Sequence, residues 1–268
     1  MIHPTAIIEQ GARLGDGVCV GPYAHVGPDV VLAEGVELFS HAVVAGRTSV
    51  GPRTRIWPFA SVGHQPQDLK YAGEPSRLEI GADCMIREHA TLNPGTEGGG
   101  MLTRVGDGCL FMMGTHVGHD CHVGSGVIMA NNATLAGHVS VGDHAVLGGL
   151  CAVHQWVRIG DGAMVGGMAG VERDVIPFGS VIGNRAHLAG LNTIGLRRRG
   201  VDRKAIGRLR LAVDQLFDDD GPMEARAERL RAGHPSEMLI EELAAFVSAE
   251  TKRRFCLPKT RLAEAEEA

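Results

Sequence analysis

The chain has 268 residues, of which 38 are glycine, about double the usual share, and only 4% are aromatic. Its net charge of −5 gives no global case for nucleic-acid binding, and six cysteines without a CxxC pair exclude a disulfide framework and a zinc knuckle. The apolar runs fall short of the ~18 residues of a membrane span, and no secretory signal is visible. These features predict a cytoplasmic protein in which glycine has a repeated structural role.

A six-residue repeat runs through the first two thirds of the chain. It keeps one phase over 2–62, resumes it over 80–92 and restarts one residue later at 105. The first position is Val, Ile or Leu in 24 of 26 hexads, and the fifth is Ala, Val, Thr or Cys in 25. Glycine fills the second position in 13 hexads. Unrelated strands of a β-sandwich would not hold one phase over eleven consecutive hexads.

This repeat predicts a parallel β-helix in which each hexad is a short strand and a corner. The branched first residue fills the interior, the small fifth residue packs beneath the next turn, and glycine takes backbone angles that other residues avoid. Three hexads make one 18-residue coil, and coils stack at the inter-strand spacing of about 4.8 Å. The prism spans 1–187. Four cysteines occupy fifth positions and are therefore predicted to be core residues: Cys84, Cys109, Cys121 and Cys151.

Two insertions interrupt the repeat, at 64–77 and 95–104. In a solenoid such insertions leave from corners and often build the binding face. The first carries a dense polar set, Gln67, Asp68 and Lys70, which favours a functional role. The second is glycine-rich, and its sequence fits a plain surface loop equally well.

Residues 188–268 lose the hexads and are predicted to form an α-helical C-terminal domain. Apolar spacing predicts helices over 202–217 and 236–249, with Ser236 as the N-cap of the latter, and 223–231 is a third candidate. Such a domain can cover the open end of the prism and protect its strand edge.

The hexads at 117, 135 and 153 stack on one face in successive coils, which places several histidines along one edge. His119 and His138 are 19 residues apart and therefore lie about one rung, ~5 Å, from each other. Two chemistries can use such a cluster. A neutral imidazole oriented by Asp120 can act as a general base, or three imidazoles can bind zinc and activate water. The cluster and its neighbours are His116, His119, His138, His154 and Gln155.

Several motifs together resemble one family of hexapeptide-repeat acyltransferases. They are the hexad ladder, the His-Val-Gly-His-Asp segment at 116–120, Asn-Asn-Ala-Thr-Leu-Ala-Gly-His at 131–138, Gln-Asp-Leu-Lys-Tyr-Ala-Gly-Glu-Pro at 67–75 and Arg-Arg-Arg-Gly at 197–200. The chain resembles the acyl-carrier-protein:UDP-N-acetylglucosamine O-acyltransferases, which carry out the first step of lipid A synthesis. The resemblance implies a left-handed β-helix, a homotrimer with sites at the subunit clefts, and a reaction without a metal or cofactor.

The resemblance also implies the chemistry. His119 would take the proton from the 3-hydroxyl of the sugar, and Asp120 would orient that imidazole. The alkoxide would attack the thioester of a 3-hydroxyacyl chain on acyl carrier protein, and the backbone N–H of Gly137 would stabilise the oxyanion.

The remaining site residues follow by the same resemblance. Gly167 matches the position that limits acyl length, and Ile194 stands where well-known members carry glutamate. The sugar, the acyl chain and the nucleotide would be held by Gln67, Asp68, Lys70, His116, His138, His154, Gln155, Asn192, Arg198 and Arg199.

Three other functions stay open on sequence grounds: an N-acyltransferase acting on a related UDP-sugar, a zinc carbonic-anhydrase-like protein, and a scaffold without activity. Basic residues near the cleft are candidates for docking the acidic acyl carrier protein: Arg158, Arg173 and Arg185.

Overall fold

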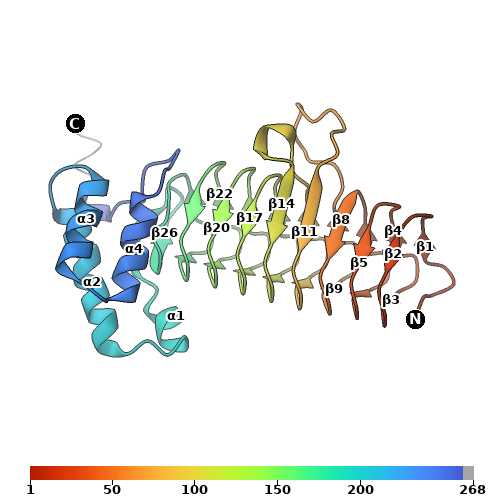
Figure 1. The fold of residues 1–268 in the computed structure, drawn as a ribbon, viewed down its shortest axis with the longest axis horizontal. Coiled ribbons are helices and arrows are strands. Elements are labelled where there is room, and N and C mark those ends of the chain that lie inside the picture. Colours follow the sequence, from red (N-terminus) through yellow and green to blue (C-terminus); the bar gives the residue numbers. More distant parts are fainter. Residues whose placement is uncertain (262–268) are drawn as a thin grey trace.

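Short strands wind into a prism with three flat faces, each a sheet that is parallel apart from the last strand of the third, and helices cover one end of it (Figure 1). The structure is a computed structural model that describes residues 1–261. The first sheet contains β1 (Ile7–Ile8), β4 (His25–Val26), β7 (Val43–Val44), β10 (Ser61–Val62), β13 (Thr91–Leu92), β16 (His116–Val117), β19 (Thr134–Leu135), β22 (Ala152–Val153) and β25 (Gly170–Val171).

The other two faces follow the same 18-residue repeat. The second sheet contains β2 (Arg13–Leu14), β5 (Val31–Leu32), β8 (Arg47–Val50), β11 (Arg77–Ile80), β14 (Leu102–Val105), β17 (His122–Val123), β20 (Ser140–Val141) and β23 (Arg158–Ile159). The third contains β3 (Cys19–Val20), β6 (Glu37–Leu38), β9 (Arg55–Ile56), β12 (Met85–Ile86), β15 (Leu110–Phe111), β18 (Ile128–Met129), β21 (Val146–Leu147), β24 (Met164–Val165), β26 (Gly179–Ile182) and β27 (His187–Leu191).

The core consists of the hexad positions that the repeat predicts to be interior. Val26 and Ala24, a first and a fifth position, are both fully buried. The four fifth-position cysteines are buried with free thiols, as predicted. Each coil therefore hides one apolar ring of side chains under the next, and this stacked column is the main source of stability.

The two insertions leave from the edge between the first and second sheets. Ser61 pairs with Thr91, 30 residues later, and Thr91 pairs with His116, 25 residues later, where an uninterrupted coil needs 18. The first loop runs from 64 to 76, and the second, 93–101, contains a short 3-10 helix, Glu97–Gly99. Both rise from the same side of the prism (Figure 1).

The C-terminal part contains the helices α1 (Thr193–Arg198), α2 (Arg203–Asp218), α3 (Met223–Gly233) and α4 (Met238–Ser248). The prediction of Ser236 as an N-cap is wrong. Ser236 has a φ of 73°, whereas an N-cap needs extended backbone, and Glu237 takes that position instead.

The end of the prism is less regular than the hexads predict. β27 returns antiparallel along β26, so the boundary expected after residue 187 falls inside this strand. After α4 the chain comes back to the prism, where Asp174 bridges to Phe255 and Leu188 bridges to Pro258.

Within residues 1–261, no helix is long and apolar enough to cross a membrane.

Candidate active site

His119 and Asp120 form a hydrogen-bonded dyad on the edge between the first and second sheets. The hexad corner turns at Asp120, whose φ is 59°, and this left-handed turn folds the carboxylate back under the imidazole. Nδ1 of His119 lies 2.8 Å from Oδ2 of Asp120, whose side chain is 1% exposed. A carboxylate only accepts, so Nδ1 donates, and in the neutral imidazole Nε2 then carries the lone pair.

The second loop holds the dyad's carboxylate. The backbone N–H of Thr96 donates to Oδ1 of Asp120 at 2.8 Å, and the Thr96 hydroxyl donates to Oδ2 at 2.6 Å. The loop comes so close that a Cβ atom at Gly99 would overlap the carboxylate. Sequence reasoning missed Thr96, because as a fifth-position residue it fits the core pattern.

The first loop brings a second carboxylate to the free side of the imidazole. Oδ2 of Asp68 lies 3.9 Å from Nε2 of His119. The backbone N–H of Lys70 donates to Asp68 at 3.0 Å, and this hydrogen bond lowers the pKa of the Asp68 carboxyl. The Gln67 and Lys70 side chains are exposed beside it.

A ladder of side chains continues from Asp120 along the same edge; we call Asp120, His138 and Trp156 the histidine ladder. All three occupy the fourth hexad position with positive φ, in successive coils. His138 meets the His119 ring edge-on at 4.9 Å and stacks on Trp156 at 3.8 Å with the planes 4° apart. Burial lowers the pKa of His138, which favours its neutral form.

The other two predicted histidines flank this ladder. Nδ1 of His116 lies 2.8 Å from the Thr91 hydroxyl, and burial lowers its pKa. His154 is exposed, and a guanidinium N–H of Arg253 donates to its Nδ1 at 2.7 Å. Another N–H of Arg253 donates to the carbonyl of Gln155 at 3.0 Å.

Gly137 lies against the imidazole of His119. A Cβ atom at Gly137 would overlap the imidazole, so only glycine leaves the ring in place. Within residues 1–261 the N–H of Gly137 makes no hydrogen bond. It is therefore a free donor next to the base.

One chain does not bring all predicted site residues together. Gly167 lies in a turn of the edge between the third and first sheets, and Asn192 lies at the edge between the second and third, where its amide donates to the Gly162 carbonyl. The Asn192 side chain also accepts from the N–H of Gly195, so it caps α1. Arg198 is exposed on α1, and Arg199 lies over the Phe178 ring, 5.7 Å from its centroid.

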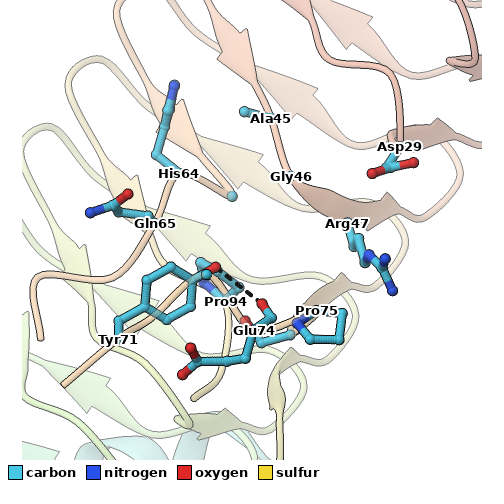
Figure 2. A pocket seen from close by; sticks show the side chains of 13 residues that line it. Asp29, Ala45, Gly46, Arg47, His64, Gln65, Tyr71, Glu74, Pro75 and Pro94 are labelled. Carbon is cyan, nitrogen blue, oxygen red and sulfur yellow. Dashed lines mark hydrogen bonds between the residues drawn. The ribbon is translucent and has the colours of Figure 1, made fainter. Parts of the chain in front are cut away.

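A cavity of about 420 Å³ lies on the N-terminal side of the first loop (Figure 2). Arg47, His64 and Glu74 line it, and the Tyr71 hydroxyl donates to the Glu74 carbonyl at 3.2 Å. His119 does not line it. The dyad lies on the edge between the first and second sheets, so we place the chemistry there and assign this cavity no part in it.

The geometry at the dyad does not fit zinc. His119, Asp120 and His138 have donor atoms within 4.8 Å of one another. However, the 2.8 Å between His119 and Asp120 is a hydrogen bond, shorter than the ~3.3 Å that separates two tetrahedral ligands each ~2.0 Å from zinc. The arrangement suits proton transfer.

Arg158 does not fit the expected role in docking a carrier protein. It pairs with the buried Asp174 at 2.7 Å and lies over the Phe246 ring, 4.4 Å from its centroid. Its guanidinium therefore belongs to the interface between the prism and the C-terminal helices. Arg173 and Arg185 stay predictions.

A prism of hexads with a histidine–aspartate dyad on its edge defines a hexapeptide-repeat acyltransferase. Residues 102–137 match the model of bacterial transferase hexapeptide repeats, and residues 174–256 match domain 2 of UDP-N-acetylglucosamine O-acyltransferase. An acyl-[acyl-carrier-protein]–UDP-N-acetylglucosamine O-acyltransferase of Rhizobium johnstonii is 47% identical over 96% of this chain and 94% of its own. One of Brucella ovis is 44% identical over 96% and 92%.

Solved structures agree with the sequences. The UDP-N-acetylglucosamine acyltransferase from Campylobacter jejuni superposes with a TM-score of 0.91 at 40% identity, over 97% of this chain and all of its own. The chain therefore belongs to the acyl-[acyl-carrier-protein]–UDP-N-acetylglucosamine O-acyltransferase family. Its fold is the expected left-handed parallel β-helix of hexapeptide repeats with a C-terminal helical domain.

Proposed function

We propose that the protein transfers a 3-hydroxyacyl chain from acyl carrier protein to the 3-hydroxyl of UDP-N-acetylglucosamine, the first step of lipid A synthesis. The observation that carries this proposal is the His119–Asp120 dyad, with Thr96 fixing the carboxylate and, within residues 1–261, no hydrogen bond to Nε2 of His119. Family membership supports the two substrates, since the relatives' names contain both.

In the proposed reaction, Nε2 of His119 takes the proton of the sugar hydroxyl while its oxygen attacks the thioester carbonyl. Asp120 stabilises the imidazolium through the Nδ1 hydrogen bond. The free N–H of Gly137 donates to the oxyanion of the tetrahedral intermediate. Collapse of that intermediate breaks the carbon–sulfur bond, and the thiolate of the carrier takes the proton back from His119.

We further propose that the active form is a homotrimer. Gly167 and the residues expected to hold the nucleotide, Asn192, Arg198 and Arg199, lie on other edges than the dyad, so a second copy would complete the site. A row of exposed apolar side chains on the edge between the third and first sheets supports such a contact. It consists of Tyr23 (61% exposed), Phe59 (54%), Met113 (44%), Leu150 (61%) and Met168 (73%).

Met168→Glu tests the trimer. A charge in a packed apolar interface is costly, so we expect monomers by light scattering and loss of turnover. Leu211→Glu, at a 68% exposed position on α2, is the matched control and should stay trimeric. A wild-type protein that is monomeric yet active would contradict the proposal.

The activity is tested by turnover of UDP-N-acetylglucosamine with 3-hydroxyacyl carrier proteins of several chain lengths, followed by mass spectrometry. We expect an O-acylated sugar nucleotide, and the length profile will show what Gly167 permits. The 3-amino analogue of the sugar runs in parallel. Product from the amino sugar alone would favour the N-acyltransferase, and no product from either would contradict acyl transfer. The cytoplasmic location stays a prediction.

A further inference from the structure

The segment that follows α4 lies outside the repeat and contacts the edge between the first and second sheets, where the histidine ladder is. Nζ of Lys252 lies 3.3 Å from the ring centroid of Trp156, and Trp156 in turn stacks on His138. The neighbouring Arg253 donates to His154, as described above. Of these two consecutive cationic residues, Lys252 thus contacts Trp156 and Arg253 contacts His154.

A buried carboxylate fixes this segment to the prism. Asp174 is fully buried and accepts hydrogen bonds from the Thr251 hydroxyl at 2.6 Å and from Nε of Arg158 at 2.7 Å. Its backbone pairs with the segment on both sides, through its N–H to the Arg254 carbonyl and its carbonyl to the Cys256 N–H, each at 2.8 Å. The cations are therefore delivered by an ordered strand-like stretch.

We propose that Lys252 and Arg253 are positioning residues of the acyl-transfer site: Lys252, acting through Trp156, sets the plane of His138, and Arg253 sets the orientation of His154. This inference rests on the proposed function for its catalytic consequence. Neither residue is expected to touch the reacting atoms.

The contact with Trp156 suits a cation at position 252. A lysine ammonium over an indole face is attracted by the negative face of the ring and limits its rotation. Trp156 then presents a flat wall against which His138 can lie. Neutral packing at position 252 would cover the indole but would not hold it in this way.

Charge also links the segment to His138. The charged and titratable groups that face its imidazole are Asp120 and His119 in the neighbouring coil, Asp68 in the first loop and Lys252. Burial is the largest cause of the lowered pKa of His138. The charges of His119 and Lys252 lower this pKa further, whereas those of Asp120 and Asp68 raise it. Removing the Lys252 charge is therefore expected to raise that pKa.

Tryptophan emission can test the stack without turnover. The chain has two tryptophans, so in a Trp57→Phe background Trp156 is the remaining one. A protonated imidazole in contact quenches indole emission more than a neutral one, so the emission of Trp156 against pH reports His138. Lys252→Met should move the midpoint to higher pH and increase quenching by acrylamide. Lys252→Arg should restore both.

Turnover then tests positioning. We expect Lys252→Met to lower kcat by about 10- to 100-fold with little change in KM, as for a displaced site group, and Lys252→Arg to recover it. Arg254→Met is the matched control, because in residues 1–261 the Arg254 side chain makes no hydrogen bond or ion pair. Arg253→Gln should alter the histidine resonance of His154 in NMR spectra and lower kcat.

An unchanged midpoint and quenching in Lys252→Met would overturn the stack, and changed emission with normal kcat would overturn its role in positioning. A wild-type protein without acyl transfer would refute the proposed function, whereas the emission measurements would still decide whether Lys252 orders Trp156 and His138.

Discussion

Two ladders on the same prism occupy the same hexad position with the same backbone turn, yet they differ in chemistry. The histidine ladder consists of Asp120, His138 and Trp156. The second, which we call the aromatic ladder, stacks Tyr23, His41, Phe59 and His89 at 5.1–5.2 Å, also at fourth positions with positive φ.

The difference lies in what surrounds the rings. Within one chain, Tyr23 and Phe59 of the aromatic ladder are more than half exposed, whereas the Asp120 side chain of the histidine ladder is 1% exposed beneath the second loop. The repeat thus supplies a spacing that suits any stacked ring. The inserted loops supply burial and the hydrogen bonds that turn one imidazole into a base.

The sharpest test of this comparison removes His119, which lies against the histidine ladder, in one variant and His89, a member of the aromatic ladder, in another. His119→Ala should lower kcat by about 10²–10⁴, the usual contribution of a general base. His89→Ala removes a ring from the aromatic ladder, which shares its edge with the proposed trimer contact, so its oligomeric state is checked by light scattering; as a trimer it should keep kcat within a few-fold of wild type. Steady-state turnover measures kcat of both variants. Comparable losses of kcat in the two trimeric variants would refute a special role for His119.

The contribution of the second loop can be isolated with two neighbouring glycines. A Cβ at Gly99 would overlap the carboxylate of Asp120, whereas a Cβ at Gly98 would meet nothing within 4 Å. Gly99→Ala should therefore displace the loop or the dyad and lower kcat by about 100-fold. Gly98→Ala is the control. Equal turnover of the two variants would show that the loop does not hold the dyad.

The carboxylate of Glu242 offers a contrast to that of Asp120, which the second loop supplies with hydrogen bonds. Oε1 of Glu242 on α4 is buried and has no hydrogen-bond partner within residues 1–261. Burial and then the charge of Asp161 raise the pKa of Glu242 to about 7. The contribution of Glu242 to the free energy of unfolding is therefore complete below its unfolded pKa of 4.5. It is lost as the pH rises through the folded pKa of about 7.

Glu242→Gln should consequently stabilise the protein at pH 8 and change little at pH 5. The gain should be on the order of 1 kcal/mol, since solvent screens this partly exposed group. Thermal unfolding at the two pH values measures it. The same change in melting temperature at both pH values would contradict a titration of Glu242.

The prism could be predicted because each hexad reports its own burial. Val26 and Ala24 can be recognised as interior residues from their own hexad. The six-residue period then identifies the interior residues of the other hexads. The end of the prism could not be predicted in the same way. β27 runs antiparallel with a shifted register at Ser180 and Val181, which no hexad describes, and the positive φ of Ser236 is set by its turn.

The site divides along the same line. His119, His138 and Asp120 were predictable, since the 18-residue coil fixes which residues are neighbours. Thr96 was hidden by a residue type that suits the core. Lys252 could not be predicted, because it is 96 residues from Trp156 and no repeat relates them. Arg158 was assigned to docking because its partner Asp174 lies outside its own hexad.

The 18-residue register also makes the molecule modular. A coil contacts only the coils above and below it, so residues 20–37 form a cassette whose removal would join Cys19 to Leu38 without changing the phase. The chemistry begins several coils later and would be carried along unchanged. Evolution can therefore lengthen or shorten the column in steps of one coil while the reaction centre keeps its own geometry.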